Sequence, residues 1–139
     1  MVDHLPFKWS VRIYFEDTDS GGVVYHSNYL KFMERARTEW LRSLELNQVD
    51  LKKKDKIIFV VANVNINYKK AARFNDELDI ETSLDKIGAS KVDLTQNIMK
   101  NSELYTSAKV SIACIHSETF KPQRIPKLIN NKWRYYDYR

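Results

Sequence analysis

Only one stretch of the chain, residues 27–46, has the apolar spacing of a long amphipathic helix. Apolar side chains recur there every three or four residues, and charged residues such as Glu34 and Arg37 occupy positions between them. The apolar stripe consists of Tyr29, Leu30, Phe32, Met33, Ala36, Trp40, Leu41 and Leu44. A single helix buries only one stripe, so the rest of the core must come from β-structure packed against it.

Five other stretches alternate apolar and polar residues, with the period of two that is typical of half-buried β-strands. The expected strands are 10–16, 57–69, 78–85, 92–99 and 108–115. In 57–69, one face is expected to carry Ala62, Val64, Ile66 and Tyr68. Short turns at Asn75-Asp76, Gly88-Ala89 and Asn101-Ser102 predict that consecutive strands pair as an antiparallel meander. The predicted architecture is α+β, with a strongly curved antiparallel sheet of about five strands wrapped around the helix.

Length predicts a single domain, which we place at 1–128, because 139 residues are too few for two ordinary cores. A leader, 1–9, precedes it, and Leu5, Phe7 and Trp9 are expected to attach this leader to the body. The C-terminal tail, 129–139, contains several aromatic residues but no period that predicts an element.

Two polar segments complete the predicted layout. Residues 47–56 are rich in lysine and are interpreted as a loop with one short helical turn, and 121–127 is interpreted as a basic loop held open by two prolines. One helix cannot cover the whole of a long sheet, and the sheet also has two edges. We therefore expect at least a dimer.

The composition excludes several classes of protein. Hydrophobic residues make up 43% of the chain, with three glycines and three prolines, which argues against a disordered or fibrous chain. We find no apolar run long enough to span a bilayer and no signal-peptide pattern in 1–9, so we expect a cytoplasmic location. The one cysteine, Cys114, is interpreted as a buried, unreactive thiol in an apolar strand.

The net charge of +5 and the pI near 9.2 favour acidic partners without choosing among nucleic acid, anionic lipid and a phosphate-bearing small molecule. A nucleic-acid interface requires a dense basic stripe or a stacking platform. The cations here are scattered, so we do not expect nucleic acid to be a partner.

The residues that suggest chemistry lie in the stretch 17–26, between the first expected strand and the helix. Gly21 and Gly22 permit a tight turn, and the helix start that follows offers unpaired N–H groups and a partial positive charge. Asp19 and His26 lie beside these amides, an arrangement that suggests chemistry on a carbonyl group. Taken alone, Asp19 is also a good turn cap and His26 a structural histidine, and Asp17 is interpreted as a turn former.

The same stretch resembles the 4-hydroxybenzoyl-CoA thioesterase branch of the hotdog-fold superfamily, and within it the Tol-Pal-associated acyl-CoA thioesterases. The matching residues are Arg12-Ile13, Thr18-Asp19, Gly22-Val23-Val24, His26, Tyr29, Glu34 to Glu39, Ala71 to Arg73, Lys121-Pro122 and Ile125 to Lys127. The resemblance implies a hotdog fold, dimers joined at sheet edges and often doubled into homotetramers, and active sites at the dimer interface. It also suggests lipid-synthesis or inner-membrane-associated partners.

Carried onto this sequence, the resemblance implies a catalytic role for Asp19 and His26, with the backbone amides of Tyr25 and His26 as donors to the oxyanion. Asp19 would act as nucleophile or as general base, and the sequence leaves both mechanisms open. Phe15 departs from the tyrosine that relatives often carry there. Candidate substrate-binding residues are Gly22 and Val23 and, for the phosphates of coenzyme A, Lys91, Lys121, Arg124 and Lys127. Candidates for the acyl pocket are Tyr29, Phe32, Met33 and Phe59.

Several alternatives compete with thioester hydrolysis. No metal or cofactor is expected, because the histidines lack zinc spacing and the twelfth position of the calcium-like stretch 17–28 is Asn28. Glu34 is a rival carboxylate, although we expect it to pair with Arg37 or Thr38. A hotdog module that binds acyl-CoA or an acyl carrier without turnover is the main functional alternative. Hydration of an enoyl-CoA is disfavoured by the spacing of Asp19 and His26.

Overall fold

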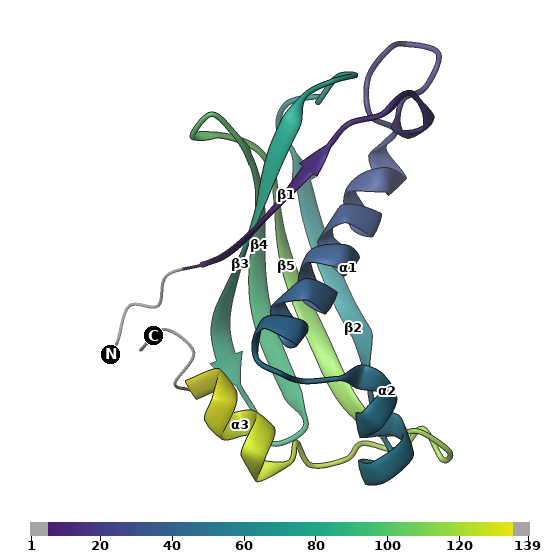
Figure 1. The fold of residues 1–139 in the computed structure, drawn as a ribbon, viewed down its shortest axis with the longest axis vertical. Helices are drawn as coiled ribbons and strands as arrows, with labels where there is room; N and C mark the ends of the chain where they lie inside the picture. Colours follow the sequence, from purple (N-terminus) through teal and green to yellow (C-terminus); the bar gives the residue numbers. More distant parts are fainter. Residues whose placement is uncertain (1–5, 135–139) are drawn as a thin grey trace.

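The computed structural model describes residues 6–134, which form a five-stranded antiparallel sheet curved around one long helix (Figure 1). The strands are β1 (Phe7–Arg12), β2 (Ile57–Tyr68), β3 (Glu77–Ile87), β4 (Lys91–Lys100) and β5 (Glu103–His116). The helices are α1 (His26–Ser43), α2 (Gln48–Asp50) and α3 (Lys127–Arg134). The predicted α+β architecture is therefore confirmed.

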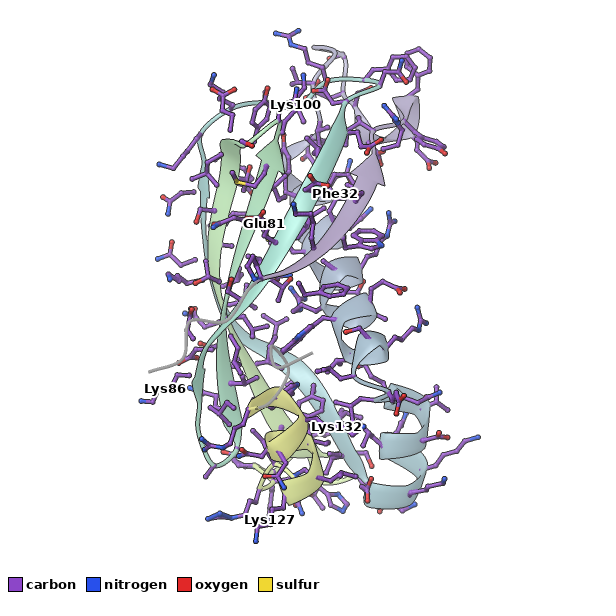
Figure 2. The ribbon with its side chains drawn as sticks, turned by 60° about the vertical axis from the view of Figure 1, so that its left-hand side comes forward. Phe32, Glu81, Lys86, Lys100, Lys127 and Lys132 are labelled. Atoms are coloured by element: carbon purple, nitrogen blue, oxygen red, sulfur yellow. The ribbon has the colours of Figure 1, made fainter. Side chains whose placement is uncertain are left out.

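Helix α1 supplies the centre of the core. Its stripe buries Tyr29, Phe32, Met33, Ala36 and Trp40, as the spacing predicts, and Figure 2 shows Phe32 between the helix and the sheet. The prediction is wrong for Leu30, which is exposed because it lies beside the buried face of the helix rather than on it. The helix ends at Ser43, three residues before the predicted limit, and Leu44 and Leu46 follow it into the core. No helix in the described part of the chain combines the length and apolar character needed to cross a bilayer.

Strand β1 differs from the predicted strand 10–16. It begins at Phe7, within the predicted leader, because Phe7 pairs with Thr82 and Arg12 pairs with Glu77 on β3. Beyond Arg12 the alternation continues in the sequence, but Phe15–Asp17 forms a 3-10 turn. Leu5 lies outside the described residues.

The order of the strands is β1-β3-β4-β5-β2, so the predicted meander is correct only for β3, β4 and β5. Strand β2 pairs with β5 rather than with β3, although β3 follows it directly in the chain. The segment 69–76 carries the chain from one edge of the sheet to the other side of α1. Strands β1 and β2 are therefore the two edges.

Strand β2 contains an irregularity that changes which residues face the helix. Val61 pairs with Ile112 and Asn63 pairs with Ser111, so Ala62 is an extra residue with no partner on β5. The pairing places Phe59 and Val61 on the helix side, together with Val64, Ile66 and Tyr68. The prediction that Ala62 shares this face is wrong, because the bulge shifts the alternation by one residue.

The C-terminal region is more ordered than the sequence predicts. Residues 127–134 form α3, whose Ile129 and Trp133 are fully buried, and the Trp133 ring stacks on Trp40 with centroids 5.7 Å apart. The described part of the tail thus belongs to the same core as the domain. Residues 47–56 contain α2 and one turn of π-helix, Leu51–Asp55, where one short helical turn was expected.

Candidate active site

The loop that precedes α1 folds back on itself as a tight hairpin. The N–H of Asp19 donates to the carbonyl of Val23 at 2.9 Å, and the N–H of Gly22 donates to the carbonyl of Asp19 at 3.0 Å. Gly22 has a φ of 80°, which glycine adopts without steric cost. The predicted need for glycine in this turn is therefore confirmed at Gly22.

A second segment holds this hairpin against the body. The N–H of Val24 donates to the carbonyl of Ala72 at 2.8 Å, and Val23 forms a β-bridge with Arg73. Tyr29 of α1 contacts the same segment, because its hydroxyl accepts the N–H of Ala72 at 3.0 Å. Tyr29 is buried, which confirms the prediction that it is a core aromatic.

Asp19 is exposed at the tip of this loop, with one carboxylate oxygen engaged. Its Oδ1 accepts the N–H of Gly21 at 2.8 Å, the turn-capping role that we weighed against catalysis. A Cβ atom at Gly21 would lie 3.2 Å from the same oxygen. Its Oδ2 accepts no hydrogen bond from any residue in 6–134. The carboxylate is thus held in place and has one oxygen available.

The start of α1 supplies fewer amide donors than the sequence suggests. The N–H of Tyr25 already donates to the carbonyl of Asp17 at 3.0 Å, and the side chain of Asn28 donates to the same oxygen at 2.8 Å. No acceptor within 6–134 engages the N–H of His26, the first residue of the helix. Of the two predicted amides, His26 is therefore the available one, at the positive end of the helix.

The His26 side chain is exposed and packs between two tyrosines. Its ring centroid lies 4.5 Å from that of Tyr25 and 6.3 Å from that of Tyr68, and the Tyr68 hydroxyl donates to the His26 carbonyl at 3.3 Å. No ion pair joins His26 to Asp19 in the described part of the chain. The two predicted catalytic side chains therefore share one end of the molecule without forming a pair.

An open pocket of about 230 Å³ lies beside the start of α1. It is lined by Val24, His26, Tyr29, Tyr68, Lys69, Lys70 and Ala71. Tyr68, Lys69 and Lys70 were not among the predicted site residues. The only signal for them was a small basic cluster at the end of a strand, which is a common feature of protein surfaces.

Comparison with known proteins identifies the family. The thioesterase-like superfamily profile matches residues 13–132, which is most of the chain. The chain belongs to the thioesterase-like superfamily. It is 41% identical over 121 residues to the acyl-CoA thioesterase YbgC of Haemophilus influenzae, covering 87% of this chain and 89% of that protein. It is 40% identical over 124 residues to the acyl-CoA thioester hydrolase YbgC of Escherichia coli O157:H7, covering 88% and 92%.

Solved structures agree with this assignment. The crystal structure of a probable thioesterase from Bartonella henselae superposes with a TM-score of 0.83 at 35% identity, covering 87% of this chain and 99% of that one. A DHNA-CoA thioesterase from Staphylococcus aureus superposes with a TM-score of 0.83 at 27% identity, covering 94% and 88%. The predicted hotdog fold is confirmed, as is the predicted family.

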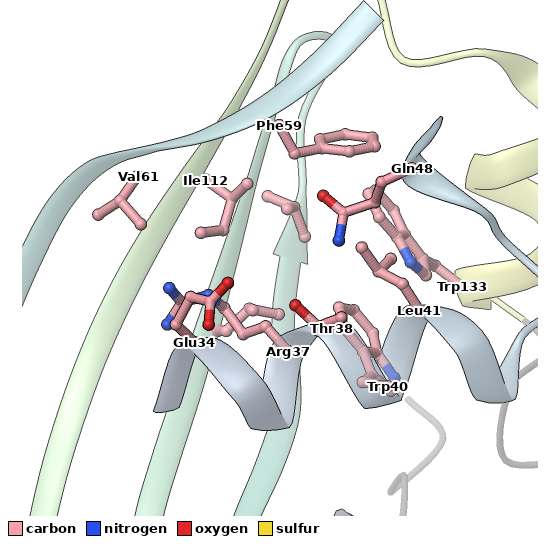
Figure 3. Close-up of a pocket in the computed structure, with 12 residues that line it drawn as sticks. Glu34, Arg37, Thr38, Trp40, Leu41, Gln48, Phe59, Val61, Ile112 and Trp133 are labelled. Carbon is pink, nitrogen blue, oxygen red and sulfur yellow. The ribbon is translucent and has the colours of Figure 1, made fainter. Parts of the chain in front are cut away.

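A second pocket of this thioesterase-like chain, of about 150 Å³, lies between the later half of α1 and the sheet (Figure 3). Its walls include Trp40, Leu41, Phe59, Val61, Val92, Leu94, Ile112 and Trp133. Glu34, Arg37, Thr38 and Gln48 supply its polar lining. Of the predicted acyl-pocket residues, Phe59 lines this pocket and Tyr29 lines the first, whereas Phe32 and Met33 are buried in the core.

Arg37 does not form the predicted ion pair with Glu34. It donates instead to the Oε1 atom of Gln96 at 2.9 Å, and burial lowers the pKa of its guanidinium while the charge of Glu34 opposes that shift. Gln96 is fully buried and donates to the carbonyl of Met33 and to Thr82, each at 3.0 Å. Arg37 is thus anchored to the centre of the sheet.

The cations predicted to bind coenzyme A lie at the opposite end of the molecule from Asp19. Lys91 begins β4, whereas Lys100 ends it and pairs with Asp76 beside the Arg73 segment. The ten residues of β4 span about 30 Å. Lys121, Arg124 and Lys127 lie at the Lys91 end, as Figure 2 shows for Lys127. Within this chain, Gly22 and Val23 share a loop with Asp19, and these cations do not approach it.

The structure accounts for Cys114 in simple terms. It lies on β5 with no exposed surface, and burial raises the pKa of its thiol from 9.0 to about 11. A neutral buried thiol is a poor nucleophile. The interpretation of Cys114 as an unreactive core residue is confirmed.

Proposed function

We propose that this chain is an acyl-CoA thioesterase that hydrolyses a thioester to a free acid and coenzyme A. The main support is one structural observation: the Asp19 carboxylate lies in a hydrogen-bonded loop that leads into the start of α1, where neither its Oδ2 nor the His26 N–H has a partner within 6–134. The relatives from Haemophilus influenzae and Escherichia coli carry names that specify the same activity.

In the proposed reaction, the substrate carbonyl lies at the start of α1. Its oxygen accepts the N–H of His26, and the helix dipole stabilises the negative charge that develops there. Sulfur donates little resonance to the carbonyl, so a carboxylate or a water activated by a carboxylate is a sufficient nucleophile.

Two routes remain within this proposal. Asp19 either removes a proton from water, whose oxygen attacks the carbonyl carbon, or attacks directly to form a mixed anhydride that water then cleaves. In both, the C–S bond breaks and the thiolate of coenzyme A leaves. The exposed His26 imidazole is the group proposed to protonate the leaving thiolate, and the proton that the consumed water releases later in the cycle returns the site to its starting state.

The decisive experiment replaces Asp19 by asparagine. The amide oxygen can still accept the Gly21 N–H, so the loop should persist. The rate of acyl-CoA hydrolysis, measured as release of free thiol, should fall by about a hundredfold or more. Asp17→Asn is the matched control, because the Asp17 carboxylate caps the N–H of Tyr14 at 2.9 Å. Full activity in a well-folded Asp19→Asn protein would overturn the assigned role. Saturable binding of acyl-CoA by the wild type without thiol release would instead favour a non-catalytic binding module.

We further propose that the active unit is a homodimer joined at the β2 edges. Strand β2 is an edge strand of twelve residues, and an unpaired edge of this length readily pairs with another strand. Two-fold pairing of β2 with its copy would place the Ile57 end of one subunit beside the Tyr68 end of the other. The basic segment 121–127 of the second copy would then approach the first pocket and supply cations for the phosphates of coenzyme A.

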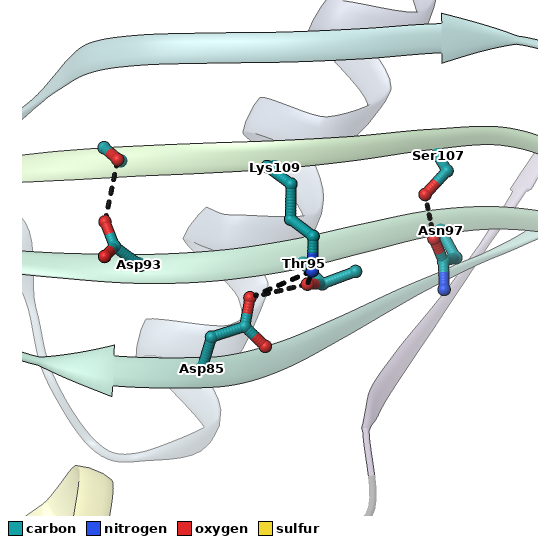
Figure 4. Close-up of polar contacts among 7 residues, drawn as sticks. Asp85, Asp93, Thr95, Asn97, Ser107 and Lys109 are labelled. Atoms are coloured by element: carbon teal, nitrogen blue, oxygen red, sulfur yellow. Dashed lines mark hydrogen bonds and ion pairs between the residues drawn. The ribbon is translucent and has the colours of Figure 1, made fainter.

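The outer face of the sheet bears on the choice between homodimer and homotetramer. It carries polar pairs that bond to one another: Ser111 with Asp93, Ser107 with Asn97, and Lys109 with Thr95 and Asp85 (Figure 4). Such a face provides little apolar area for stacking two sheets. We therefore propose the edge-joined dimer as the basic assembly. Light scattering, which measures the mass in solution, distinguishes this dimer from a homotetramer.

A cytoplasmic location at the periphery of the inner membrane, with lipid-synthesis partners, is also part of this proposal. Its support is the net charge of +5, which favours anionic surfaces. Cell fractionation at low and high salt tests it, because electrostatic attachment is lost as salt screens it.

A further inference from the structure

The side of β2 that faces α1 is largely uncovered. Val61, Val64 and Tyr68 are 48%, 37% and 45% exposed, although all three lie on the inner face of the sheet. Their partners on β5 are the buried residues Ile112, Val110 and Thr106. We refer to Val61, Val64, Ile66 and Tyr68 as the β2 strip. The inner face of β5 is therefore buried, whereas an apolar strip stays open along the neighbouring edge strand β2.

The β2 strip links the two pockets of the molecule. Tyr68, at one end, lines the pocket beside His26, and Val61, at the other end, lines the pocket between α1 and the sheet. Val64 and Ile66 lie between them on the same face. The apolar surface is therefore continuous from the proposed catalytic end to the second pocket.

The second pocket ends against aromatic rings. Trp133 of α3 stacks on Trp40, and the Phe59 ring lies 5.6 Å from Trp133 (Figure 3). Trp133 is 1% exposed and lies just beyond the segment 13–132 that the family profile matches. The end wall of the pocket is therefore supplied partly by a residue outside that match.

The polar side chains around this pocket are compatible with an apolar occupant. Arg37 has its guanidinium anchored to Gln96, so its alkyl stem can line the pocket while its charge is held at the sheet. Glu34 also lines the pocket, but it is exposed, so its carboxylate can stay hydrated at the rim. The remaining walls are mostly aliphatic and aromatic.

The length of this path favours a long occupant. His26 and Leu41, which line the first and second pockets, are fifteen residues apart on α1 and therefore about 22 Å apart along its axis. One leaflet of a bilayer, filled by fatty acyl chains, has a hydrocarbon thickness of about 15 Å. A ring-sized or short acyl group whose thioester lies at His26 would not reach the second pocket.

We propose that the β2 strip and the second pocket bind a linear, long-chain acyl group, and that Trp133 sets its maximum length. This inference rests on the proposed thioesterase function and names the substrate class of that site. The acyl chain lies along the strip from the His26 end, with its methyl end against Trp133, and a dimer partner at the β2 edge closes over the chain.

The first test uses the protein of residues 1–139 and measures kcat/KM for butanoyl-, octanoyl-, dodecanoyl-, hexadecanoyl- and benzoyl-CoA. Each buried methylene should raise kcat/KM by about fourfold until the acyl chain reaches Trp133, so the long linear substrates should exceed the butanoyl and benzoyl substrates by at least tenfold. Trp133→Ala should move the optimum to longer chains, and Trp133→Phe should leave it almost unchanged. Hydrolysis confined to short or aromatic substrates would overturn the inference while leaving the thioesterase proposal intact. Absence of hydrolysis for every substrate would instead contradict the thioesterase proposal.

A second pair of variants covers the case in which Trp133→Ala does not fold. Val64→Trp should block the strip, lowering kcat/KM for hexadecanoyl-CoA at least tenfold more than for butanoyl-CoA with the oligomer intact. Asn65→Trp is the matched control, since Asn65 pairs with Lys109 on the outer face. If Val64→Trp lowered kcat/KM equally for all acyl lengths and also dissociated the oligomer, a second copy of the protein would fill the strip. The inference would then be wrong.

Discussion

The hydroxyl of Tyr29 and the backbone N–H of Ala72 form a buried hydrogen bond of 3.0 Å. Ala72 also accepts the N–H of Val24, so one peptide segment contacts both α1 and the loop that carries Asp19. Burial raises the pKa of the Tyr29 hydroxyl, although its bond to Ala72 works in the opposite direction. The position of the proposed catalytic loop therefore depends on a residue inside the core.

Tyr29→Phe should lower the free energy of unfolding by about 1–3 kcal/mol, because it leaves the buried Ala72 N–H without an acceptor. Urea denaturation monitored by circular dichroism measures this change. Tyr68→Phe serves as the control, since the exposed Tyr68 hydroxyl makes only a 3.3 Å contact, and it should change stability by less than about 0.5 kcal/mol. Equal effects of the two substitutions would contradict the structural role given to Tyr29.

Gly22→Ala should destabilise the protein by about 1–2 kcal/mol, because its φ of 80° is unfavourable for a residue with a Cβ atom. Space is not the cause, since a Cβ atom there meets no atom within 4 Å. Gly22→Asn should cost less, because asparagine tolerates this conformation better. Thermal melting of both variants checks the ranking, and an alanine variant as stable as the wild type would refute it.

Cys114 should make stability fall at alkaline pH. Its thiol has a pKa of 9.0 when unfolded and about 11 when folded, so the folded state holds the proton more tightly. The contribution is complete below pH 9 and is lost as pH rises towards 11, by at most about 1.4 kcal/mol per pH unit. Urea titrations between these pH values should show a shallower loss for Cys114→Ala than for the wild type, after allowance for its lower starting stability. Parallel curves would show that Cys114 does not contribute.

Arg37→Met should destabilise the protein by about 1–3 kcal/mol, because the buried Gln96 Oε1 atom loses its donor while the alkyl volume is kept. Arg35→Met provides a control on the same helix, where the side chain is exposed. Guanidinium unfolding compares them. The role of Arg37 as an anchor would be disproved if both variants matched the wild type.

The sequence predicts those elements in which a periodic pattern extends over many residues and the two faces differ in polarity. The stripe of α1 and the alternation of β3, β4 and β5 are of this kind, and their predicted positions are close to those observed. The start of β1 at Phe7 depends on a partner 75 residues away, Thr82, which no local pattern reveals. Helix α3 was missed because, in eight residues, it buries only Ile129 and Trp133.

The candidate site could likewise be predicted only in part. Motif spacing located Asp19, His26 and the glycine turn in one stretch, and the structure places them in one loop and at one helix start. The hydrogen bond from the Tyr25 N–H to the Asp17 carbonyl could not be predicted, because a backbone hydrogen bond across a loop does not depend on which residue types form it. The separation of Lys121 from Asp19 likewise follows from topology rather than from sequence.

The unpaired Ala62 in β2 has a consequence for insertions and deletions in this strand. Phe59 and Val61 lie on one side of it and Val64 on the other, and they share a face only because the strand has one residue more than its neighbour opposite. Removing Ala62 would rotate one half of the strand relative to the other, so that either Val61 or Val64 would turn towards solvent. The one-residue bulge in this edge strand thus keeps the apolar side chains on both sides of Ala62 directed towards the same interior.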